Sequence, residues 1–147
     1  MIDRIARDKF AELLRHLTAG QISNDEFENR LPLKSKDPAV NKIFWHGAWA
    51  LYSDMSTYKL IGECRLSKSS RRDVARWILF LKSDLEYEWP FWRSLHFFPG
   101  YLLIVLSFGL LIPIAKRRLT KCGDQEVWPF IRKSDFEHAL ANPPYLN

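Results

Sequence analysis

Apolar side chains recur at helical spacing along residues 2–30, which predicts two helices joined by a tight turn. Residues 2–18 form one amphipathic pattern, and Gly20 stands where such a helix ends in a left-handed conformation. Ser23 and Glu26 then form a capping box that starts a short second helix. On the first helix, the expected apolar face is Ile2, Ile5, Phe10, Leu13, Leu14 and Leu17, with Arg4, Arg7, Asp8, Glu12 and Arg15 elsewhere around it.

The stretch from residue 37 to residue 66 predicts one helix followed by one extended segment. Asp37 and Pro38 provide an N-cap and a first helical residue, for a helix that runs to about residue 52. Gly47 in this helix permits the close approach of another element. Residues 58–66 alternate in part between apolar and polar, and their expected strand partner is residues 102–106.

Two further helices are predicted in the second half of the chain. Ser70 with Asp73 caps a helix over residues 71–83. Ser134 with Glu137 starts a short final helix that ends before a pair of prolines. The apolar face of the 71–83 helix consists of Val74, Trp77, Ile78 and Leu81.

Residues 97–115 form an apolar run without a charged side chain. About 20 apolar residues are needed to cross a hydrocarbon core about 30 Å thick, so the run just reaches that length. Pro99, Gly100 and Pro113 interrupt it, and the run equally fits a segment wrapped by the protein core. The anchors in lipid or core would be Phe97, Leu102, Leu103, Ile104, Leu106, Leu110 and Leu111, and the residues at lipid headgroups would be Lys116, Arg117 and Arg118.

Two Trp-Pro-Phe triplets, at residues 89–91 and 128–130, flank this run. If the run enters a membrane, Trp89 and Trp128 would be interfacial anchors. If the run is buried, they would be rigid corners that cover its ends. Both roles are structural, because the triplets contain no reactive group.

Together the patterns predict a mainly α fold: a small single helical domain with at most one short pair of extended segments, built around the apolar segment 97–115. A chain of 147 residues suffices for one domain with its own core and is too short for two ordinary domains. Its parts would be a helical hairpin (1–33), a helical core (37–90), the apolar segment (97–115) and a C-terminal tail with a short helix (116–147).

The stretch LLRHLTAGQISNDEFENR, residues 13–30, carries a pattern of two short helices around a glycine. At Leu14, Leu17, Gly20, Ile22, Glu26 and Phe27 it resembles the short helical hairpin family called SHOCT. The resemblance implies a small interaction or oligomerisation element, often found beside membrane segments. The same residues also fit two helices joined by a glycine turn without any family relationship.

Composition and motifs argue against several functional classes. An apolar fraction of 47% and a net charge of +5 differ from the composition of a disordered chain. Cys64 and Cys122 form neither a disulfide framework nor a Cys-x-x-Cys pair, which indicates a reducing cytoplasm, or the inner face of a membrane if residues 97–115 insert. The four histidines are scattered, and there is no nucleophile elbow, P-loop or dinucleotide fingerprint. We therefore expect no catalytic residue, metal or cofactor.

Basic residues gather at the start of the 71–83 helix, where the helix macrodipole disfavours positive charge. A compensating acidic partner, phosphate or lipid headgroup is therefore expected, and internal pairing with Asp73, Glu63 or the acidic residues at 84–88 is the alternative. The members of this basic set are Lys68, Arg71, Arg72 and Arg76.

These observations predict a non-catalytic protein-interaction module, such as an adaptor, inhibitor or immunity-type protein. Its partner would be another protein with an acidic surface, and an anionic membrane would also attract it. The alternative is a small basic regulator that binds nucleic acid through residues 68–76. A steep fall of affinity with salt would identify that alternative.

Overall fold

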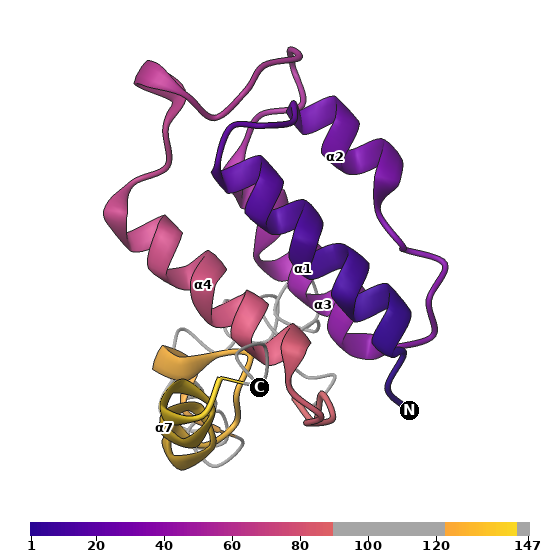
Figure 1. The fold of residues 1–147 in the computed structure, drawn as a ribbon, viewed down its shortest axis with the longest axis vertical. Coiled ribbons are helices and arrows are strands. Elements are labelled where there is room, and N and C mark those ends of the chain that lie inside the picture. Colours follow the sequence, from indigo (N-terminus) through magenta and orange to yellow (C-terminus); the bar gives the residue numbers. More distant parts are fainter. Residues whose placement is uncertain (90–122, 144–147) are drawn as a thin grey trace, which may run out of the picture.

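The computed structural model describes residues 1–89 and 123–143, and these parts of the chain are helical (Figure 1). The predicted mainly helical, small single domain is confirmed. The α-helices are α1 (Arg4–Thr18), α2 (Asn24–Arg30), α3 (Pro38–His46), α4 (Lys68–Lys82) and α7 (Lys133–Ala141), and the short 3₁₀ turns are η1 (Ala48–Leu51), η2 (Gly62–Cys64) and η4 (Gln125–Val127).

The apolar segment 97–115 lies outside the described residues, and so do the sites predicted on it. In the part of the chain that the structure describes, no helix is long and apolar enough to cross a membrane. The predicted residues outside the description are Phe97, Leu102, Leu103, Ile104, Leu106, Leu110, Leu111, Lys116, Arg117 and Arg118, together with His96 and Cys122.

Helix α1 is central to the described fold, since α2, α3 and α4 all pack against it. Figure 1 shows α2 and α4 on opposite sides of α1. Phe10, Leu14 and Leu17 of α1 are completely buried, and Val74 and Leu81 of α4 are buried with them. The burial of this apolar surface is the main source of the stability of the helix pair.

The turn between α1 and α2 has the conformation that the sequence predicts. Gly20 adopts a φ of 69°, in the left-handed region that glycine enters without steric penalty. Its N–H donates to the carbonyl of Leu17 (3.0 Å), and the N–H of Gln21 donates to that of His16 (2.9 Å), which is a Schellman motif. Ser23 and Glu26 form the reciprocal capping box of α2. Phe27 then packs onto Phe10 with ring centroids 6.3 Å apart.

Three predicted element boundaries need correction. Helix α4 begins at Lys68 and not at residue 71, because the hydroxyl of Ser67 accepts the N–H of Ser70 and so provides the N-cap. Helix α3 ends at His46 and continues only as the 3₁₀ turn η1. Helix α7 begins at Lys133 without a side-chain cap, so the predicted capping box at Ser134 does not form.

Within the described residues, the predicted extended segment 58–66 makes one bridge contact, and this contact is not with its predicted partner. An isolated antiparallel bridge joins Ser23 to Lys59, and η2 interrupts the 58–66 segment soon afterwards. Asn24 holds this loop in place: its amide donates to the carbonyls of Ser53 and Ser56, each at 2.9 Å. The expected strand partner at 102–106 lies outside the described residues.

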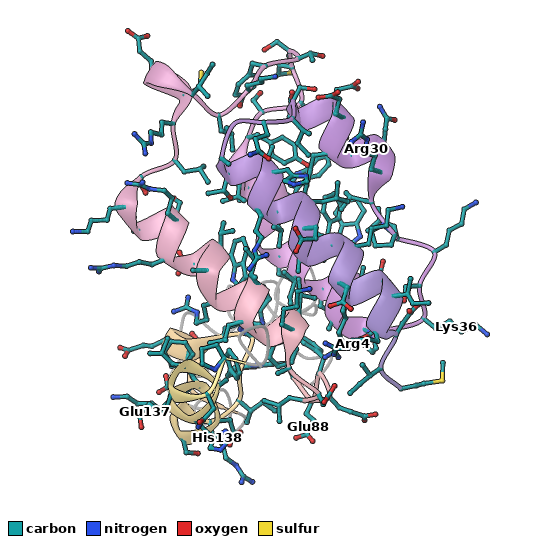
Figure 2. All side chains as sticks on the ribbon, in the orientation of Figure 1. Arg4, Arg30, Lys36, Glu88, Glu137 and His138 are labelled. Carbon is teal, nitrogen blue, oxygen red and sulfur yellow. The ribbon has the colours of Figure 1, made fainter. Side chains whose placement is uncertain are left out.

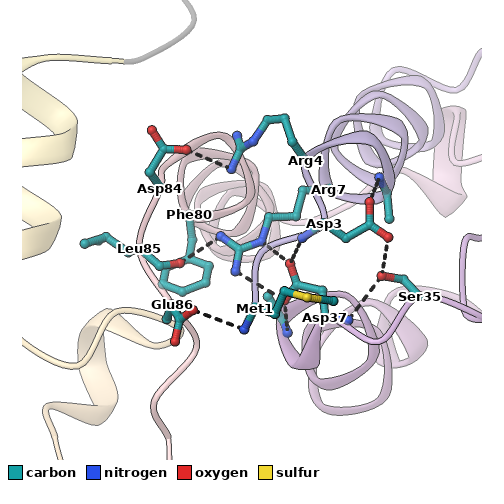
Figure 3. A network of polar contacts seen from close by, with 12 residues as sticks. Met1, Asp3, Arg4, Arg7, Ser35, Asp37, Phe80, Asp84, Leu85 and Glu86 are labelled. Carbon is teal, nitrogen blue, oxygen red and sulfur yellow. Dashed lines mark hydrogen bonds and ion pairs between the residues drawn. The ribbon is translucent and has the colours of Figure 1, made fainter.

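The predicted faces of α1 are wrong at two positions. Ile5, expected on the apolar face, is 82% exposed. Arg7, expected among the outward charges, is completely buried. Figure 3 shows the reason: Arg7 donates from Nε to Oδ2 of Asp37 (2.6 Å) and from Nη2 to Oδ1 (3.2 Å). Asp37 is itself completely buried, so the two residues form a forked ion pair inside the core.

The Arg7–Asp37 pair connects three elements. Arg7 Nη1 donates to the carbonyl of Leu85 (2.8 Å) and to that of Ser83 (3.2 Å), which follow α4. Asp37 caps α3 by accepting the N–H of Ala39 (2.9 Å). Burial by itself would raise the pKa of the Asp37 carboxyl, but the bonds from Arg7 and from backbone N–H groups together hold that pKa below its usual value. Asp37 is therefore charged and fully hydrogen-bonded at neutral pH.

Gly47 brings α3 and α4 into direct contact, as the sequence predicts. A Cβ atom at this position would lie 2.7 Å from Cζ2 of the Trp77 ring, which is closer than real side chains approach. The indole of Trp77 therefore packs on the bare backbone at the end of α3. This contact sets the separation of the two helices.

Candidate functional site

The two tryptophans of the Trp-Pro-Phe triplets lie in the core. Trp89 is 6% exposed, and its Nε1 donates to the carbonyl of Pro129 (2.9 Å). Trp128 is 4% exposed and meets Trp77 edge to face, with ring centroids 5.9 Å apart. These contacts fasten residues 123–131 onto α4. The sequence predicts Trp89 and Trp128 either at a membrane interface or in the core, and their burial and contacts within the described residues are those of core side chains.

Arg76 belongs to the same internal attachment. Its side chain is 20% exposed and bridges to Asp73 on its own helix. The guanidinium also donates to the carbonyls of Glu126 (2.6 Å) and Trp128 (2.8 Å). Arg76 therefore does not belong with the other members of the predicted basic set, because each of its three guanidinium nitrogens donates to a group within the fold.

Lys68, Arg71 and Arg72 remain together at the N-terminal end of α4, and we call them the basic surface. All three are exposed, and none forms an ion pair within the described residues. They occupy positions i, i+3 and i+4, so their positive charges lie on neighbouring turns of one helix face. The macrodipole adds to this mutual repulsion, because its positive end is at the N-terminus.

The cations around the other end of α4 are matched. Lys82 in the last turn contacts Asp8 (2.9 Å) on α1. Arg4 donates to the terminal carbonyls of Lys82 (2.8 Å) and Ser83 (2.6 Å), and its second partner is Asp84 (3.4 Å). Positive charge is also favourable at a helix C-terminus. The basic surface is thus the unmatched end of a helix whose other end is fully paired.

A second surface, which sequence reasoning missed, combines aromatic and acidic side chains. Trp45 and Trp49 are 56% and 38% exposed, and their rings lie 5.4 Å apart over Phe44. Tyr52 continues the row, with its ring centroid 6.4 Å from that of Trp49. The spacing of Trp45 and Trp49 by four residues, on the side of the predicted 37–52 helix away from Ile43, is the signal in the sequence that indicates this surface.

Two carboxylates lie near Tyr52, at one end of the aromatic row. Burial first, and then the negative charges of Glu28 and Asp54, raise the pKa of the Tyr52 phenol. Its hydroxyl is buried and has no hydrogen bond of good geometry within the described residues. Neither carboxylate forms an ion pair in these parts of the chain. We call Trp45, Trp49, Tyr52, Glu28 and Asp54 the aromatic–acidic surface.

The described residues contain no group of three or more His, Cys, Asp or Glu side chains that could hold a metal ion. Cys64 is exposed in the turn η2. A depression of about 500 Å³ lies between residues 1–5 and residues 34–36, but its polar side chains Asp3 and Ser35 bond to each other. The two surfaces are therefore the features on which a function can be argued.

Comparison with known proteins yields no match: no family model fits the chain, and no curated protein or solved structure is significantly similar to it.

Proposed function

We propose that this protein is a non-catalytic interaction module that docks on the acidic surface of another protein through Lys68, Arg71 and Arg72. The observation that carries the proposal is the contrast along α4. Arg76 and Lys82 are paired internally, whereas the three cations of the basic surface are exposed and unpaired in the described chain. Unfavourable charge retained on a rigid helix favours a binding role over a scaffold role.

The basic surface is held in place before any partner arrives. Ser67 caps α4, and Val74 and Trp77 anchor the following turns in the core. A cation in the first turn of a helix opposes the macrodipole by about 0.3–1 kcal/mol, and this effect falls off in the following turn. Carboxylates of a partner would remove this penalty on binding while little conformational entropy is lost in the helix.

Protein is the better ligand class than nucleic acid. Nucleic-acid surfaces interleave exposed aromatic rings with many Lys and Arg side chains, and DNA-binding proteins often neutralise about six to ten phosphates. The basic surface has three cations and no aromatic side chain among them. The resemblance of residues 13–30 to SHOCT hairpins supports the same class, since such hairpins are interaction elements.

Charge reversal tests the proposal directly. The full-length double variant Arg71→Glu/Arg72→Glu is expected to bind a fluorescent oligoglutamate peptide at least about tenfold more weakly than wild type, a loss of about 1.4 kcal/mol. Fluorescence anisotropy measures the affinity. The control is Lys34→Glu/Lys36→Glu, which makes the same change in net charge at two other exposed lysines; Figure 2 shows Lys36 extending away from the fold.

The control variant should bind like wild type. Equal weakening by both double variants would mean that net charge alone is measured, and the proposed surface would be wrong. The same titration with duplex DNA tests the nucleic-acid alternative. DNA that binds more tightly than oligoglutamate, with an affinity that falls steeply with salt, would favour that alternative, and weaker DNA binding would exclude it.

A further inference from the structure

The aromatic–acidic surface is held as rigidly as the basic surface. Phe44 supports both exposed tryptophan rings edge to face, at 4.9 and 5.8 Å. Tyr52 packs edge to face on Phe27 of α2 at 5.9 Å, and Asn24 of the same helix holds the loop that carries Asp54. Exposed tryptophans on a fixed support are the residues that most often dominate binding energy at interfaces.

The chemistry of this surface selects a cationic ligand. Tryptophan rings attract Lys and Arg side chains through their negative faces. This attraction is weaker for solvent-exposed pairs than for buried pairs, but it still contributes to the binding energy. Glu28 and Asp54 add two carboxylates that have no ion-pair partner within the described residues. A positively charged helix face would therefore satisfy the aromatic and the acidic groups together.

The basic surface of the same chain has that composition. Its arginines can stack on tryptophan while pairing with carboxylates, which a planar guanidinium does better than an ammonium group. The two surfaces cannot meet within one molecule at these positions, because Glu28 lies on α2 and the basic surface on α4, on opposite sides of α1 (Figure 1).

We propose that the aromatic–acidic surface binds the basic surface of a second copy of this chain, so that the protein associates head to tail. This inference rests on the proposed function, because it names one occupant of the basic surface. Two different surfaces meet in such a contact, and the resulting pair still presents one free basic surface on one molecule and one free aromatic–acidic surface on the other. Association is therefore open-ended unless the rotation between copies closes a ring.

Complementary variants test the head-to-tail contact. Arg71→Glu/Arg72→Glu abolishes the basic surface and leaves the aromatic–acidic surface intact. Glu28→Gln/Asp54→Asn removes the two carboxylates and leaves the basic surface intact. In sedimentation velocity at low salt, wild type should show a mass that rises with protein concentration, whereas each variant alone should remain a monomer or associate at least about tenfold more weakly.

An equimolar mixture of the two variants is decisive. Each contributes one intact surface, so the mixture should form a one-to-one heterodimer that does not grow further. Either a wild type that stays monomeric at all concentrations or a mixture that stays monomeric while wild type associates would overturn the inference. The proposed function is judged separately, because the loss of oligoglutamate binding by Arg71→Glu/Arg72→Glu does not depend on self-association.

Discussion

Asp37→Asn is expected to lower the free energy of unfolding by about 3–5 kcal/mol, because it leaves the buried guanidinium of Arg7 without its counter-charge. Arg7 and Asp37 are both completely buried, so water cannot replace the missing partner. Asparagine keeps the shape of the side chain and is itself a good N-cap, so the loss of α3 capping is small. The change removes the charge and also replaces one of the two acceptor oxygens by a donor NH2 group, so part of the Arg7 fork is lost with it.

Urea unfolding at pH 7 measures this loss. The pH dependence of the free energy of unfolding provides a second test. The pKa of Asp37 is lowered in the folded state, so its contribution is complete above the pKa of the unfolded chain and is lost as the pH falls through the lowered value. The gap between wild type and Asp37→Asn should narrow over that acid range. A loss below about 1 kcal/mol at pH 7 would contradict the role of a buried ion pair.

Arg7→Met/Asp37→Asn is the matched comparison for this prediction. Removing both charges leaves no ion stranded in the core, so the double variant should lose less stability than the two single changes add up to. Additive losses would mean that the two side chains act independently. The carbonyls of Ser83 and Leu85 lose their donor whenever Arg7 is replaced, so the double variant should still be less stable than wild type.

Phe80→Ala is the second large effect, with an expected loss of about 3–5 kcal/mol in the free energy of unfolding. Phe80 is 2% exposed and joins three parts of the fold. Its ring meets Phe130 edge to face at 5.1 Å and Tyr87 at 6.2 Å. The guanidinium carbon of Arg7 lies over the same ring, 5.4 Å from its centroid. Truncation would leave a cavity where these groups converge.

Urea unfolding again measures the change, and hydrogen exchange locates it. Amides at residues 127–131 should exchange faster in Phe80→Ala, because Phe130 loses its packing partner on α4. The control is Ile5→Ala at a side chain that is 82% exposed, where a change within about 0.5 kcal/mol is expected. Equal losses in the two variants would show that Phe80 has no central packing role.

Elements whose signals are local could be predicted from the sequence. The α1–α2 hairpin depends on Gly20, Ser23 and Glu26, which act on backbone groups within a few residues, and each forms the expected contact. The start of α4 could not be placed so well, because Ser67 and Ser70 are both competent N-caps. Only the structure shows that Ser67 receives the N–H of Ser70.

Features that depend on distant partners were missed. Arg7 is completely buried because it finds Asp37, which no local pattern indicates. The helical spacing alone does place Arg7 on the buried face of α1, because it lies three residues before Phe10 and seven before Leu14. What the spacing lacks is the partner that makes a buried arginine acceptable there. For Arg76, the internal pairing with Asp73 that the sequence offers as an alternative forms, whereas its carbonyl partners at Glu126 and Trp128 are too distant in sequence to be predicted.

The melting temperature of Arg71→Glu/Arg72→Glu tests the central claim, that the basic surface exists for binding and not for stability. The melting temperature of this variant should be equal to that of wild type or a few degrees above it. Reversal removes like-charge repulsion, and acidic side chains near a helix N-terminus complement the macrodipole. The carboxylate introduced at position 72 would also lie one turn before Arg76. A melting temperature several degrees below that of wild type would instead show that these cations stabilise the fold and belong to the scaffold.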